Sequence, residues 1–223
     1  FVWRYPAAEL AAVPAKVSVT SIVHKAEQTT LERPAFLSKD GLTAAEMGTA
    51  LHAFLEHADF SALAAAKAAG GLEEAILAER QRQVDRQLVA PEIAEKLDVS
   101  RIRRFVEGEA FAKICAADEV LRELAFITAL PADAVLAAQG TEGVRAEGEQ
   151  VLVQGIADLV LVYPDHLELL DYKTDRRKTE ADFLRAYRAQ LNLYALAIDK
   201  RFAPKKVTYK GICSLELGKL IEV

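Results

Sequence analysis

The sequence is poor in the residue that cross-links small proteins and binds metal clusters: it has two cysteines among 223 residues. Cys115 and Cys213 lie far apart, and neither belongs to a CxxC pair. A zinc ribbon and a four-cysteine iron–sulfur cluster are therefore excluded. So low a cysteine content is the ordinary state of proteins in a reducing compartment, and we expect a cytoplasmic protein.

Long apolar runs and an excess of positive charge are also missing. No stretch of about 18 apolar residues occurs, so the sequence predicts neither a transmembrane helix nor a membrane partner. Lys and Arg number 28 against 33 Asp and Glu, and the net charge of −5 argues against a broad nucleic-acid-binding surface. Local basic patches remain compatible with that balance. We find no internal repeat, phosphate-binding glycine loop or nucleophile elbow.

What remains is the composition of a globular chain, with 52% hydrophobic and 27% charged residues. The length suits one domain with a substantial core. The chain begins with Phe1 rather than Met, and we interpret residues 1–20 as a linker and entry segment. Residues 21–223 then form the folded domain.

The most informative stretch covers residues 151–175. Two apolar runs rich in β-branched residues flank a turn at Pro164-Asp165, a pattern typical of a β-hairpin. Counting back from a four-residue loop places Asp158 opposite Asp171, with Cβ atoms about 5 Å apart. Lys173 lies two residues farther along and points to the same face. A three-residue loop without a bulge would instead place the two aspartates on opposite faces.

Both strands of this hairpin are apolar on both faces, which is typical of central strands covered on two sides. The apolar residues of the first strand are Ile156, Val160 and Val162 on one face, and Ala157, Leu159 and Leu161 on the other. Two opposed carboxylates in such a place are destabilising unless something neutralises them. A divalent cation with oxygen ligands is the simplest answer, and the neighbouring lysine would hold a water or a phosphate oxygen.

Gly155-Ile156-Ala157-Asp158, followed by Asp171-Tyr172-Lys173-Thr174-Asp175, resembles the PD-(D/E)XK nuclease superfamily, and the DYKTD string resembles its RecB-type family. A D-x-K triplet alone occurs by chance in many chains, so the resemblance depends on further strings in the family's order. It implies an α/β fold of the restriction-endonuclease type, with a mixed central sheet flanked by helices. Residues 21–223 would be the nuclease domain.

Three further strings resemble the same family. Gly48-Thr49-Ala50-Leu51-His52 matches G-x-x-x-H, whose histidine is a metal ligand, and lies on an amphipathic helix. Gln190 and Tyr194 match Q-x-x-x-Y, a motif associated with positioning the DNA strand. Arg122-Glu123 resembles the RE segment before the hairpin, whose glutamate lies near the metal, and makes Glu123 a second-tier candidate.

Each of these residues also has a purely structural interpretation. A lone histidine on an amphipathic helix is usually structural, a helical tyrosine such as Tyr194 usually packs in the core, and Glu123 fits an edge strand equally well. Positive charge follows the hairpin and makes phosphate contacts or a solvated surface equally reasonable. The second-tier basic residues are Arg176, Arg177 and Lys178.

The resemblance implies phosphodiester hydrolysis by Asp158, Asp171 and Lys173, with a metal held by His52 and the two aspartates. Mg²⁺ is the expected ion, and an imidazole ligand also suits Mn²⁺. Some relatives carry an iron–sulfur cluster, which two cysteines cannot build. In particular the chain resembles the C-terminal nuclease domain of AddA-type helicase–nucleases.

That likeness implies an exonuclease that acts on a single DNA strand delivered by a helicase motor. It further implies a larger polypeptide, an AddB-like partner protein and a role in double-strand-break repair and recombination. The alternative from another class is a catalytically silent DNA-binding or docking module of the same fold. A site-specific endonuclease is a third possibility, although we find no base-reading element.

Periodicity and capping residues predict the remaining elements. The expected helices are 43–58 with a capping box at Thr43, 72–89, a short one from Pro91, 100–116 capped by Ser100, and 179–202 capped by Thr179. The expected strands outside the hairpin are 121–130 and 206–217. Arg101, Arg103 and Arg104 at a helix start are either phosphate contacts or solvated residues.

Overall fold

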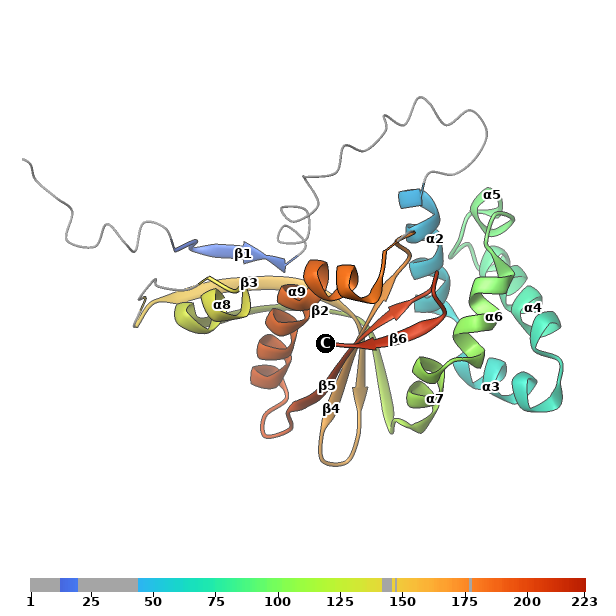
Figure 1. Ribbon diagram of the computed structural model, residues 1–223. Helices are drawn as coiled ribbons and strands as arrows, with labels where there is room; N and C mark the ends of the chain where they lie inside the picture. The colour runs from blue at the N-terminus through green and yellow to red at the C-terminus, as the bar shows by residue number, and fades with distance from the viewer. Residues whose placement is uncertain (1–12, 20–43, 142–145, 147, 177) are drawn as a thin grey trace, which may run out of the picture.

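The computed structural model describes residues 13–19, 44–141, 146, 148–176 and 178–223 (Figure 1). The predicted capping box at Thr43 lies outside these residues. Within them, none of the helices combines the length and apolar character needed to cross a membrane.

The centre of the fold is a mixed sheet in the order β1-β3-β4-β5-β6, with β2 also paired to β3. Its strands are β1 (Lys16–Ser18), β2 (Glu119–Pro131), β3 (Gln150–Val162), β4 (Leu167–Lys173), β5 (Val207–Ser214) and β6 (Lys219–Glu222). The β1/β3 and β4/β5 pairs are parallel and the others antiparallel. The short β6 was not predicted, and β1 draws part of the entry segment into the sheet.

Helices cover both faces of this sheet, which confirms the predicted α/β architecture (Figure 1). One apolar cluster joins the sheet to α8 (Ala132–Ala138) and α9 (Glu180–Arg201). The other joins the opposite face to the helical layer formed by α2 (Ala44–His57), α3 (Phe60–Ala69), α4 (Leu72–Asp85), α5 (Pro91–Ala94), α6 (Val99–Glu107) and α7 (Glu109–Ala116). The candidate catalytic residues lie where these two layers meet the sheet.

Helix boundaries follow capping chemistry, and one prediction was wrong. Asp98, not Ser100, is the N-cap of α6, because its carboxylate accepts a hydrogen bond from the Ser100 N–H at 2.9 Å. The predicted helix 100–116 is also two helices, separated at Gly108. Arg101 is buried and pairs with Asp98 and Glu216, so it does not face a phosphate.

The corrected cap gives a first prediction. Asp98→Ala should lower the free energy of unfolding by about 1 kcal/mol or more, because the first turn of α6 loses its acceptor and Arg101 loses one of its partners. Ser100→Ala removes only a hydroxyl that donates to Asp98, so its effect should be a few tenths of that. Urea unfolding of the two variants measures the difference, and equal losses would contradict the assignment.

Other helices differ from expectation in length or number. The helix expected over 72–89 ends at Asp85, and α3 was missed altogether. The capping box of Thr179 with Asp182 is confirmed at the start of α9.

The hairpin has the predicted register. Val162 pairs with Leu167, and the Tyr163 N–H donates to the His166 carbonyl at 3.0 Å, so the loop has four residues. One detail was wrong: Ile156 is 50% exposed, because β3 extends beyond the helices that cover one of its faces. That exposed segment borders the site described next.

Candidate active site

The site forms where β3 and β4 part, at a point called here the fork. Their pairing ends at Leu159 and Leu170; β4 continues along β5, whereas β3 continues along β2 and β1. Asp158 and Asp171 are the next residues on the two strands, as the hairpin count predicted. The Tyr172 N–H donates to Asp158 Oδ2 at 2.7 Å, so a side chain takes a bond that a longer ladder would have used.

Glu123 lies on the neighbouring strand beside Asp158. The β2–β3 ladder pairs Arg122 with Leu159 and Leu124 with Ala157, so Glu123 and Asp158 occupy the step between these pairs. Glu123 has a φ of 46°, which is uncommon for a residue with a side chain and is found mainly where function demands it. Ala157 packs toward α9 and Leu159 toward the helical layer, so the ribbon changes face at this step.

Three side chains converge on one point with the donor types that divalent cations prefer. Ligand atoms of His52, Glu123 and Asp158 all lie within 4.8 Å of one another. His52 Nδ1 is 3.7 Å from Asp158 Oδ2, too far for a hydrogen bond. Two ligands of one Mg²⁺, each about 2.1 Å from the ion, can be up to about 4.2 Å apart, so this spacing suits a shared cation.

The electrostatics of these donors favour a cation as well. Burial, and then the charge of Asp171, raise the pKa of Asp158 well above its usual value. Burial and the nearby carboxylates of Glu56 and Asp171 likewise raise the pKa of Glu123. Burial and Lys173 lower the pKa of His52, so its imidazole is neutral at pH 7 and can bind a metal. The unbalanced negative charge is what a divalent ion would neutralise.

Asp171 is held by two partners rather than by the His52 group. Its Oδ1 accepts a hydrogen bond from Gln190 Nε2 at 3.1 Å, and its Oδ2 lies 2.5 Å from Lys173 Nζ. Burial disfavours the ammonium form of Lys173, but the charges of Asp171 and Asp158 outweigh it and raise the pKa of Lys173. Lys173 therefore remains a cation at neutral pH.

Tyr187 supports Lys173, and sequence reasoning assigned it only to the buried side of a helix. Its ring lies between two ammonium groups, 4.6 Å from Lys173 Nζ and 4.7 Å from Lys178 Nζ. Its hydroxyl donates to Asp175 at 2.8 Å, which fixes the ring. Cation–π contacts of this kind hold a lysine in one orientation. Nothing in the local sequence indicates this role, because the contact joins α9 to the end of β4.

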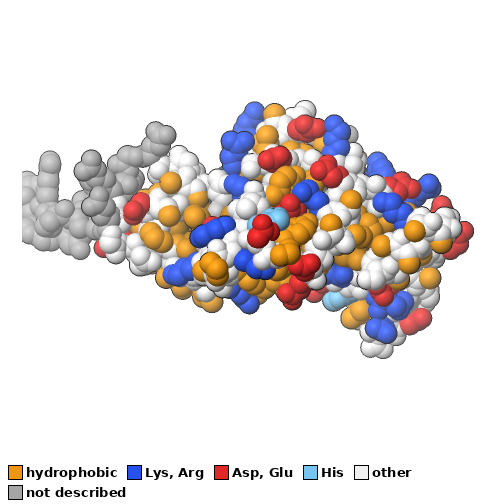
Figure 2. Space-filling model, turned by 90° about the horizontal axis from the view of Figure 1, so that it is seen from below, with side chains coloured by type: hydrophobic (Ala, Val, Ile, Leu, Met, Phe, Trp, Pro, Cys, Tyr) orange, Lys and Arg blue, Asp and Glu red, His pale blue; other side chains and the backbone are white. Residues whose placement is uncertain are grey.

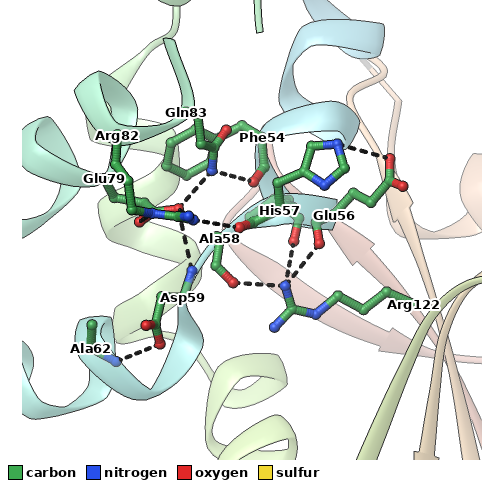
Figure 3. A network of polar contacts seen from close by, with 11 residues as sticks. Phe54, Glu56, His57, Ala58, Asp59, Ala62, Glu79, Arg82, Gln83 and Arg122 are labelled. Atoms are coloured by element: carbon green, nitrogen blue, oxygen red, sulfur yellow. Dashed lines mark hydrogen bonds and ion pairs between the residues drawn. The ribbon is translucent and has the colours of Figure 1, made fainter. Parts of the chain in front are cut away.

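Helix α2 sets the position of His52, and polar side chains hold the end of that helix (Figure 3). Arg122 donates to the backbone carbonyls of Glu56 and Ala58 at 2.8 and 2.7 Å. Arg82 and Gln83 on α4 donate to two more carbonyls of the same end. These donors satisfy groups that a helix C-terminus leaves unpaired. Arg122 thus ties the helix of His52 to the strand of Glu123.

Gly48 sets how closely α2 approaches β4. A Cβ at Gly48 would lie 2.8 Å from Thr174 Oγ1, so only glycine allows the present separation. Gly48→Ala should therefore cost about 1–3 kcal/mol through overpacking, despite the better helix propensity of alanine. In the double variant with Thr174→Ala the space is restored, and at least about 1 kcal/mol of that loss should return. Urea unfolding of the four proteins in this cycle gives the coupling energy, and strict additivity would contradict the contact.

The candidate catalytic groups open into one cleft of about 650 Å³. Its walls are residues 125–127 of β2, residues 154–156 of β3 and Ser18 of β1, together with His52, Asp158, Asp171, Lys173, Gln190 and Tyr194. A second hollow of about 410 Å³ lies on the other side of His52 and Asp158, beside Glu123 and Glu56. The sequence motifs from three regions of the chain thus meet in one place.

The remaining predicted residues are placed less directly. Gln190 and Tyr194 are buried at the cleft wall and share a hydrogen bond of 3.1 Å, so they also hold Asp171 in place. Arg176 is exposed, Lys178 pairs with Asp175, and Arg177 lies outside the described residues. Basic and acidic side chains are interspersed on the face shown in Figure 2, without a continuous basic surface.

Comparison with known proteins agrees with this geometry. A family model described as the PD-(D/E)XK nuclease superfamily matches residues 25–219. The chain belongs to this superfamily. The match covers the fork, the helix of His52 and α9, so the family's fold includes every element of the site.

Relatives of this PD-(D/E)XK chain share one name, that of the larger component of an ATP-dependent helicase/nuclease. The chain is 36% identical over 215 residues to the ATP-dependent helicase/nuclease protein of Moorella thermoacetica, covering 90% of this chain and 14% of that protein. The protein of the same name from Acetivibrio thermocellus is 30% identical over 236 residues, covering 98% of this chain and 18% of that protein. The chain therefore spans less than one fifth of the length of these relatives.

Proposed function

We propose that this PD-(D/E)XK domain hydrolyses phosphodiester bonds of DNA in a metal-dependent reaction. One observation carries the proposal: Asp158 and Asp171 face each other where two strands part, with His52, Glu123 and Lys173 around them. A buried arrangement of this kind costs stability unless a cation and a substrate use it. A catalytically silent module would not need it.

The residues present fit a divalent cation. His52, Glu123 and Asp158 would hold it, with Asp171 facing Asp158 across the fork. Carboxylate oxygens suit Mg²⁺, and the imidazole of His52 makes Mn²⁺ equally acceptable. When bound, such an ion lowers the pKa of water and offsets charge that develops on the transferred phosphate.

The side chains themselves would position the reactants. Lys173 Nζ, fixed by Asp171 and the Tyr187 ring, would donate a hydrogen bond to the attacking water or to a phosphate oxygen. Its raised pKa favours this role as a charged donor over that of a proton acceptor. Gln190 would keep Asp171 in the orientation that faces Lys173, and Tyr194 would line the path of the strand.

The names of the relatives extend the proposal to the larger protein. We infer that the domain is the nuclease part of an AddA-type helicase–nuclease, which removes nucleotides from a single strand supplied by its motor. An AddB-like partner, a cytoplasmic location and a role in double-strand-break repair and recombination belong to the same proposal. The relatives' printed name supports the pairing of helicase and nuclease.

The direct test is cleavage of end-labelled single-stranded DNA by the purified chain with Mg²⁺, Mn²⁺ or EDTA. We expect product only with a divalent ion, and mononucleotides or short products that accumulate from an end. Binding of Mn²⁺ is measured in parallel by its effect on the melting temperature. A chain that neither cuts nor gains stability with any of these ions would be a docking module instead.

A further inference from the structure

The cleft has an apolar wall that the catalytic groups do not use. Ile127, Leu152 and Ile156, called here the apolar strip, are 63%, 37% and 50% exposed. Ile156 pairs with Ala125, and Ile127 with Gln154, so the strip lies on adjacent strands of the β2–β3 ribbon. Both isoleucines line the cleft that holds Asp158 and Lys173.

The strip is exposed because the ribbon is covered on one face only. The alternate residues Phe126, Val153 and Ala157 are buried against α8 and α9, so Ile127, Leu152 and Ile156 point to the other face. Isolated exposed apolar residues are ordinary, but a contiguous group beside a cleft marks a binding surface. Each of these positions would be polar if the face only met water.

Positive charge borders the strip on one side. Along the outer edge of β2, Arg201 donates to the Ala125 carbonyl at 2.9 Å and Lys200 to the Ala129 carbonyl at 2.6 Å, and both side chains are exposed. Cations beside an apolar track match a single nucleic-acid strand, whose phosphates are charged and whose unpaired bases present apolar faces. In a duplex, paired and stacked bases would not offer those faces.

We propose that Ile127 and Ile156 contact unpaired bases of the substrate strand while its backbone passes Lys173. This inference rests on the proposed nuclease function, because the strip is continuous with that cleft. Aliphatic side chains that slide against or between bases are a known means of separating them. The strip would therefore make the site selective for unpaired strands with intact bases, without reading sequence.

Binding in EDTA tests the inference without turnover. We would measure anisotropy of a short labelled oligothymidylate and of an abasic strand of the same length, with the native chain and with Ile127→Ser/Ile156→Ser. The double variant should raise the Kd for oligothymidylate about tenfold, as expected for loss of two partly buried isoleucines. Its Kd for the abasic strand should equal that of the native chain.

Leu217→Ser is the matched control, since Leu217 is 41% exposed and does not line the cleft. It should change neither Kd. An unchanged Kd for oligothymidylate in the double variant, or equal losses for both strands, would overturn the proposal. A fall in melting temperature seen only in the isoleucine variant would also overturn it, because the strip would then pack against another part of the chain.

Hydrolysis of bis(p-nitrophenyl) phosphate with Mn²⁺ separates this inference from the proposed function, because that small diester has no base. A native chain that hydrolyses it but binds both strands equally retains the nuclease proposal and loses the strip. A chain that hydrolyses no substrate yet prefers strands with bases loses the nuclease proposal and retains the strip.

Discussion

Lys173→Ala is expected to lower the rate of DNA cleavage by about 10²–10³-fold, or roughly 3–4 kcal/mol of transition-state stabilisation. The ammonium group is held 2.5 Å from Asp171 and remains charged, so its loss removes a fixed donor from the reacting phosphate. Metal binding should be retained, because Lys173 supplies no ligand atom. Cleavage assays and Mn²⁺ titration of the same variant check both halves of the expectation.

Lys178→Ala is the comparison for this variant, because Lys178 touches the same Tyr187 ring from 4.7 Å but does not line the cleft. We expect it to lose less than tenfold in rate, with circular dichroism unchanged in both proteins. Equal losses in the two variants would mean that general positive charge, rather than a positioned donor, matters. Loss of metal binding in Lys173→Ala would mean that the variant had altered the fork itself.

Asp158→Asn is expected to abolish metal binding and cleavage while making the metal-free chain more stable. Burial and Asp171 raise the pKa of Asp158, so its charge is held in the folded state at a cost. A neutral amide removes that cost and can still accept the Tyr172 N–H bond. We expect a gain of about 1 kcal/mol, a rise of about 2–4 °C in Tm for a chain of this size.

Metal reverses the order of the two proteins. At a concentration of 100 Kd, Mn²⁺ should stabilise the native chain by about 2.7 kcal/mol and leave the variant unchanged. Without metal, a carboxyl with a raised pKa stabilises the fold while protonated, so the native chain should approach the variant as the pH falls through that pKa. A variant less stable than the native chain in EDTA at neutral pH would contradict this account.

The hairpin was predictable because its information is local. Pro164-Asp165 specifies the turn, and the turn fixes which residues of the two runs face each other. The capping box of Thr179 is local in the same way. Helix α3 escaped prediction because its residues are mostly alanine and show no apolar stripe, although alanine itself favours helix.

The composition of the metal site depended on contacts between distant segments. Glu123 joins His52 and Asp158 only because the β2–β3 ribbon changes face at that step, which no spacing in the sequence indicates. The exposure of Ile156 was missed for a related reason, since the apolar pattern does not say where the covering helices end. Resemblance identified the residues, and the fold determined which of them meet.

The contribution of α9 has a consequence for when the domain becomes competent during synthesis. Every ligand atom has left the ribosome once Lys173 is made, yet Gln190 and Tyr187, which hold Asp171 and Lys173, come later. A nascent chain therefore carries all the donors in a loose arrangement and acquires a defined site only after α9 docks. For the same reason, a single proteolytic cut before α9 would disarm the domain without removing any of its ligands.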